Sequence, residues 1–71
     1  MGMTQTERVL WHLQNRGPID CKTAAVDYGI MALHSRIADL RREGYEFKMT
    51  YKAGKNRYGD NTHWYEYELQ V

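Results

Sequence analysis

The sequence contains a single cysteine, Cys21, and a single proline, Pro18. One cysteine excludes an internal disulfide, so the fold has to be stabilised by packing, as in proteins of reducing compartments. No run of apolar residues reaches the roughly 18–20 residues that a membrane-spanning helix needs, and we recognise no secretory signal. We therefore expect a cytoplasmic protein that makes no contact with a membrane.

An excess of charge of one sign is also lacking. There are 10 lysines and arginines and 9 acidic residues, and the net charge is +1. The charges are nevertheless segregated along the chain: residues 48–57 include four basic residues and no acidic one, whereas residues 61–71 include two acidic residues and no basic one. The distribution of charge decides contact with nucleic acid more than its sum does.

The length of 71 residues predicts one domain over residues 1–71. A domain of this size buries only about 60% of its unfolded surface, which leaves no room for an enclosed substrate cavity beside the core. The chain has no glycine-rich phosphate loop, and His12, His34 and His63 lack metal-ligand spacing. We therefore expect no enzyme, no catalytic residue, no metal, no cofactor and no small-molecule substrate.

The first of three predicted helices covers residues 5–15. Thr4 and Glu7 have the spacing of a capping box, in which each side chain accepts a hydrogen bond from the other residue's amide. Gly17 supplies a left-handed stop, and the proline that follows it prevents continuation.

The second and third helices are predicted over residues 21–27 and 31–43. Asp20 can cap the second helix, and Gly29 marks its end. The third helix has one apolar stripe at spacings of four and three, formed by Leu33, Ile37 and Leu40.

Beyond residue 44 the apolar period changes from that of a helix to that of a strand. Alternation predicts strands over residues 45–52 and 62–69, joined by a tip rich in turn residues at 53–61. The expected fold is α+β: a winged helix-turn-helix, with three helices followed by a two-stranded β-hairpin wing. The major groove of DNA admits one helix while a second helix braces it across the backbone. We therefore expect double-stranded DNA as the partner, with the third helix in the major groove and the wing on the backbone.

Six short segments along nearly the whole chain resemble a family of small winged helix-turn-helix proteins common in phages and prophages: Thr4–Leu10, Gly29–Ile30, Arg36–Arg41, Gly44–Tyr45, Lys55–Gly59 and Tyr65–Leu69. The resemblance implies a DNA-binding fold and a phage or prophage source, and hence the cytoplasm of a bacterial host cell. The chain departs from that pattern at Met31 and Ala32, where a polar capping residue and a basic residue are usual, and at Lys22, where an apolar residue is typical.

The candidate DNA contacts lie in the third helix and in the wing: Met31, Ala32, His34, Ser35, Arg36, Asp39, Lys52, Lys55, Asn56 and Arg57. Arg36 is the best candidate for guanine or phosphate, because arginine binds both with two parallel hydrogen bonds. Its alternative is an ion pair with Asp39 or Glu43 on a solvated helix face. For Lys55 and Arg57 the alternative is an exposed hairpin that these charges keep soluble.

Trp11 lies opposite the apolar stripe of the first helix, and Trp64 has outward parity on the last strand. Two interpretations remain open for both residues: partial burial under neighbouring side chains, or a homodimer or partner surface.

The sequence thus favours a transcriptional regulator or architectural factor that binds duplex DNA. The alternative is a protein-interaction module with the same fold, which docks a host or phage protein through its aromatic surface.

Overall fold

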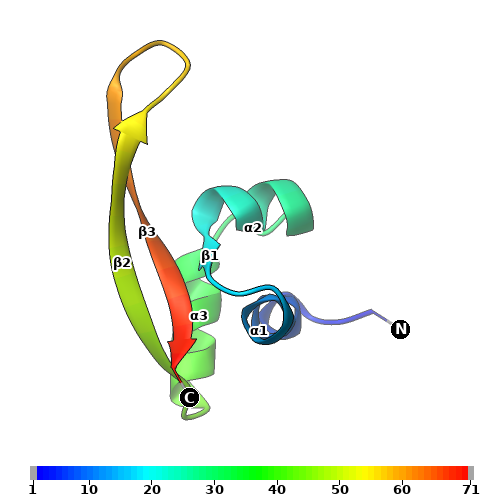
Figure 1. The fold of residues 1–71 in the computed structure, drawn as a ribbon. Helices are drawn as coiled ribbons and strands as arrows, with labels where there is room; N and C mark the ends of the chain where they lie inside the picture. Colours follow the sequence, from blue (N-terminus) through cyan, green and yellow to red (C-terminus); the bar gives the residue numbers. More distant parts are fainter. Residues whose placement is uncertain (1, 71) are drawn as a thin grey trace.

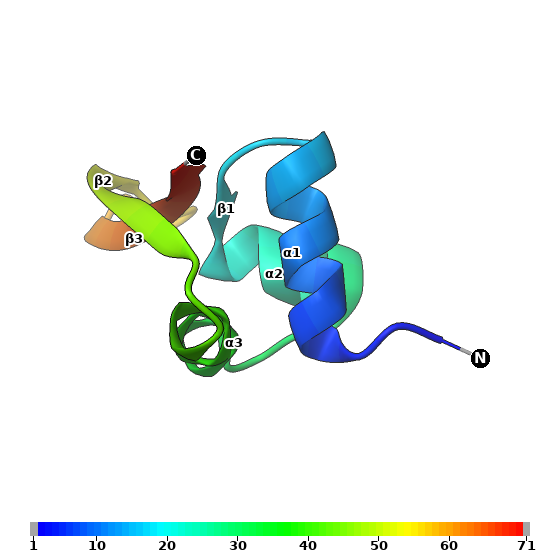
Figure 2. The same cartoon turned by 90° about the horizontal axis from the view of Figure 1, so that it is seen from below.

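The computed structural model describes residues 2–70. Along them lie α1 (Gln5–Asn15), β1 (Ile19–Asp20), α2 (Cys21–Tyr28), α3 (Leu33–Arg42), β2 (Glu46–Lys55) and β3 (Asn61–Gln70). The three helices gather on one side of the sheet, and the β2–β3 hairpin extends beyond them (Figures 1 and 2).

Side chains cap the first two helices as the sequence predicts. Thr4 Oγ1 accepts from the Glu7 amide at 3.1 Å, and Glu7 Oε1 accepts from the Thr4 amide at 2.9 Å. Asp20 Oδ1 accepts from the Thr23 amide at 2.7 Å. Each contact satisfies an amide that the first turn of a helix leaves without a backbone partner.

A left-handed glycine connects α2 to α3. Gly29 has φ of 66°, a conformation that a side chain disfavours, and its amide donates to the Ala25 carbonyl at 3.0 Å. The next amide, that of Ile30, donates to the Ala24 carbonyl at 2.9 Å. This turn directs the Ile30 side chain into the core, where it is 1% exposed.

The third helix is shorter than the predicted range of 31–43. It begins at Leu33, because the backbone of the N-cap residue Ala32, with φ of -118° and ψ of 64°, is not helical, and the methyl side chain of Ala32 cannot accept an amide hydrogen. Met31 lies before the helix with 85% of its surface exposed. The helix ends at Arg42, one residue earlier than expected.

The sheet has three strands rather than the two predicted, in the order β1-β3-β2 and antiparallel throughout. The link after Pro18 forms the additional strand, with Ile19 opposite Tyr67. The hairpin strands are also longer than the predicted 45–52 and 62–69, and only residues 56–60 form the turn. Lys55, predicted in the tip, therefore lies on a strand together with Lys52, and the ladder fixes the positions of both.

The core lies between the helices and the root of the hairpin. Nine apolar residues are buried there: Val9, Leu13, Ile19, Ala24, Ile30, Leu33, Ile37, Leu40 and Tyr67. Leu33, Ile37 and Leu40, called here the α3 stripe, are each 1% exposed. The stripe fixes the rotation of α3 about its axis and thereby selects which residues of this helix face solvent.

A buried histidine joins α1 to α2. His12 Nε2 lies 3.2 Å from the Pro18 carbonyl oxygen, and Nδ1 lies 2.7 Å from the Tyr28 hydroxyl. Because a carbonyl can only accept, the geometry assigns the ring hydrogen to Nε2, and Nδ1 accepts from the tyrosine. Both ring nitrogens of His12 thus serve the fold.

Candidate nucleic-acid interface

The solvent-facing surface of α3 follows from the position of its stripe. Residues advance by about 100° around a helix, so Ser35, Ala38 and Arg42 lie opposite the α3 stripe. Ser35 is half-buried and Ala38 is exposed. The Arg42 side chain is 75% exposed. These three residues form the solvent-facing side of α3.

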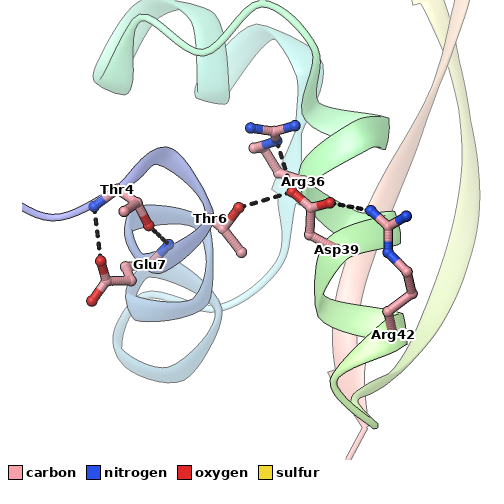
Figure 3. Close-up of polar contacts among 6 residues, drawn as sticks. All are labelled: Thr4, Thr6, Glu7, Arg36, Asp39 and Arg42. Atoms are coloured by element: carbon pink, nitrogen blue, oxygen red, sulfur yellow. Dashed lines mark hydrogen bonds and ion pairs between the residues drawn. The ribbon is translucent and has the colours of Figure 1, made fainter.

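One flank of α3 is bound to α1 through Asp39. The Thr6 hydroxyl donates to Asp39 Oδ2 at 3.1 Å, and the Arg42 guanidinium contacts Oδ1. Figure 3 shows Thr6 pointing from α1 toward this carboxylate, with Arg36 and Arg42 on the turns of α3 before and after it. Asp39 therefore faces α1, rather than standing on the outward face where the sequence placed it.

Arg36 lies on the same flank. Its Nε is 3.3 Å from Asp39 Oδ2, an ion-pair distance, but this buried nitrogen does not have the geometry of a hydrogen bond. The side chain is 31% exposed. The structure thus contains the ion pair that was the alternative to DNA contact, and any phosphate reached by Arg36 has to compete with Asp39.

The pKa of the Asp39 carboxyl is lowered from its ordinary value of 3.8. The main causes are the hydrogen bonds from Arg42 and then from Thr6; partial desolvation opposes them, and the positive charge of Arg36 adds to the lowering. A carboxyl with a depressed pKa in the folded state stabilises the fold above its unfolded pKa. This stabilisation is lost as the pH falls through the folded pKa, below 3.8.

Arg42→Ala is expected to raise the pKa of Asp39 toward 3.8, because it removes the strongest hydrogen bond to the carboxylate. The measurement is the side-chain carboxyl ¹³C shift of Asp39 followed by NMR through the acid range. Arg41→Ala is the matched control: Arg41 packs its guanidinium 5.9 Å above the Phe47 ring and should leave the midpoint in place. A midpoint at or above 3.8 in the unmodified protein would contradict the assignment.

The start of α3 is apolar and exposed. Met31 and Ala32 precede the first turn, and His34 is exposed on the flank opposite Asp39. Six candidates were predicted around this helix. These three and the half-buried Ser35 make no side-chain hydrogen bond to other described residues. The remaining two, Arg36 and Asp39, form an ion pair with each other.

The four predicted wing residues are all exposed. Lys52 lies opposite Trp64, and Lys55 opposite Asn61 at the end of the ladder. The Asn56 side-chain oxygen accepts from the amides of Tyr58 and Asp60, at 2.9 and 3.1 Å. Asn56 thus shapes the turn, while the two lysines and Arg57 extend their charges into solvent.

The two tryptophans occupy different surfaces, and both are partly covered. Trp11 is 40% exposed, and the Arg16 guanidinium lies 5.8 Å from its ring centroid. Trp64 is 36% exposed and packs on Gly54, where an added Cβ would stand 3.4 Å from its ring. Partial burial accounts for both rings, and a dimer or partner surface stays a prediction.

Two sets of exposed side chains are missing from the site residues predicted from the sequence. Arg42 was not among the candidates predicted around α3, although the helix period places it opposite the α3 stripe. Alternation along the two predicted strands puts Tyr51 and Tyr65 on the same face of the hairpin as Tyr67, and the register agrees. They are exposed because the hairpin extends past the helices, which alternation alone does not reveal.

Among residues 2–70, no group of three or more His, Cys, Asp or Glu side chains has an arrangement that could hold a metal ion. Every helix within the same range is too short or too polar to cross a lipid bilayer.

In a comparison with protein families, residues 4–70 match the family described as winged helix-turn-helix domain. No curated protein and no solved structure matched the chain. The match confirms the predicted fold class, and the third strand is an addition to it; the phage source stays a prediction. The chain therefore belongs to the winged helix-turn-helix domain family, whose fold is a DNA-binding fold.

Proposed function

We propose that this domain binds double-stranded DNA with α3 in the major groove and the wing on the adjacent backbone. The observation that carries the proposal is the wing: Lys52, Lys55 and Arg57 are exposed in a segment, residues 48–57, that has no acidic residue. Arg42 adds a largely exposed cation on the outward face of α3. Phosphate contacts position a protein on duplex DNA, and the groove-facing helix adds selectivity.

In this proposal the biological role is that of a transcriptional regulator or an architectural factor of a phage or prophage, acting in the cytoplasm of its bacterial host. The apolar start of α3 limits the number of base-edge hydrogen bonds, since Met31 and Ala32 have none to offer. These two side chains can instead make an apolar contact with the methyl group of thymine.

A second function, docking of a host or phage protein, is favoured by exposed apolar residues around the helix-turn-helix. Val26 on α2 is 74% exposed, and Met31 in the turn is exposed to a similar extent. Exposed apolar side chains are a common feature of protein-interaction surfaces.

Titration of a fluorescent pool of genomic duplexes distinguishes the two functions. With about four phosphate contacts, the logarithm of the affinity should fall with the logarithm of salt concentration at a slope near −3.6. Affinity then falls about 100-fold between roughly 50 and 200 mM salt. Absence of binding at the lower salt concentration would remove the DNA proposal and leave protein docking.

A further inference from the structure

Three aromatic side chains form a continuous surface on the projecting half of the hairpin. Tyr51 stands directly opposite Tyr65, and their ring centroids are 5.8 Å apart with planes at 73°. His63, on the diagonal, lies 5.8 Å from Tyr51 with ring planes at only 20°. We call Tyr51, His63 and Tyr65 the wing aromatic face.

The helices do not cover this face. It continues the same side of the sheet that buries Tyr67 in the core, and the hairpin that carries it extends beyond the helices (Figure 1). Tyr51 is 58% exposed and Tyr65 46% exposed. Beside them lies an open depression of about 490 Å³, lined by Tyr51, Ala53, Gly54, Lys55, Asn61, Thr62 and His63.

Charge is distributed unequally between the two sides of the hairpin. Side chains alternate along a strand, and the β2–β3 ladder has a regular register, so odd-numbered residues share the aromatic side. The strand carboxylates all have even numbers and lie on the opposite side: Glu46, Glu66 and Glu68. Lys48 and Lys52 share that opposite side with the carboxylates. The aromatic side of the two strands has one cation, Lys55, and no carboxylate, so its charge is complementary to a phosphodiester backbone.

We propose that the wing aromatic face binds unpaired bases of a single-stranded nucleic acid by stacking, with Lys55 on the backbone. In a duplex the faces of the bases are covered by their neighbours, and only the edges are open to the grooves. An exposed aromatic ring can stack on a base that is unpaired and unstacked. Sites for single strands usually combine such aromatic residues with basic ones. This activity extends beyond duplex binding and does not depend on α3.

The test compares three probes by fluorescence anisotropy: oligothymidine and oligouridine of about 15 nucleotides, and a blunt duplex of the same length. Tyr51→Val and Tyr65→Val remove a ring and keep a β-branched residue that suits a strand. Each is expected to weaken single-strand binding roughly 5- to 100-fold, and to leave duplex binding within about twofold. A 2-aminopurine placed in the oligothymidine should be quenched by the unmodified protein and less so by either variant.

Trp64→Val is the matched control, because it removes a ring from the opposite side of the same hairpin and should preserve single-strand affinity. A preference for oligothymidine that is kept by oligodeoxyuridine, which lacks the methyl group, assigns the site to DNA, and a preference for oligouridine assigns it to RNA. The proposal is overturned if neither strand binds, or if the tyrosine variants weaken duplex and single strand equally. It is also overturned if the variants change only the sedimentation coefficient, since the face then holds a second copy. Duplex binding without single-strand binding would refute this site alone.

Discussion

Ile37→Ala is expected to lower the free energy of unfolding by roughly 2–5 kcal/mol, the range for large-to-small changes in a packed core. Ile37 is the middle member of the α3 stripe and is 1% exposed. A domain of 71 residues has a total stability of about 4–11 kcal/mol, from roughly 0.05–0.15 kcal/mol per residue. A large part of the protein's stability thus depends on one side chain, and the midpoint of thermal unfolding should fall by roughly 10–30 °C.

Urea denaturation followed by circular dichroism measures this change. The control is Val26→Ala, which removes two methyl groups from a side chain that is 74% exposed and should alter stability by less than about 0.5 kcal/mol. If Ile37→Ala cost less than about 1 kcal/mol, the α3 stripe would not be the centre of the core.

Removing Arg42, Lys55 and Arg57 together, each as alanine, is expected to weaken duplex binding roughly 500-fold at about 0.1 M salt. Each phosphate contact releases counterions and contributes about 0.9 to the salt slope, so the slope should become shallower by about 2.7. The three residues come from the outward face of α3, the end of the wing ladder and the turn, and all are exposed.

A second triple variant controls for net charge. Arg8, Arg16 and Arg41 are also exposed, and they lie on α1, at its C-cap and on the flank of α3 that packs over Phe47, so their replacement by alanine removes the same charge from outside the proposed contacts. This control should retain most of the affinity and of the salt slope. Equal losses in both triple variants would show that binding follows net charge, and would refute an interface built from α3 and the wing.

Local chemistry explains why the helix and turn predictions from sequence agree with the structure. The Thr4–Glu7 capping box, the Asp20 cap and the Gly29 stop act within a few residues of themselves, so spacing is sufficient to identify them. The same locality explains the error at Met31. No side chain at Ala32 caps the helix, and the prediction started the helix two residues early.

Contacts between distant segments account for the two features that the sequence did not predict, the strand β1 and the position of Asp39. β1 consists of two residues and exists only because Ile19 and Asp20 pair with Tyr67 and Glu66, which follow them by 48 and 46 residues in the chain. The position of Asp39 likewise depends on Thr6, 33 residues before it. No periodicity within α3 could indicate that Asp39 accepts a hydrogen bond from Thr6 on α1 while it pairs with Arg36 and Arg42.

By itself, then, the sequence determined the three helices, the change to strand periodicity, the buried stripe of α3 and the basic wing, because caps, stops and alternation are local properties of the chain. The tertiary structure decided how the arginines of α3 are paired. Asp39 forms ion pairs with Arg36 and Arg42, and the Thr6 hydroxyl of α1 donates to the same carboxylate. The tertiary structure also decided which aromatic residues are exposed, because alternation places Tyr51, Tyr65 and Tyr67 on one face, while the reach of the helices buries only Tyr67.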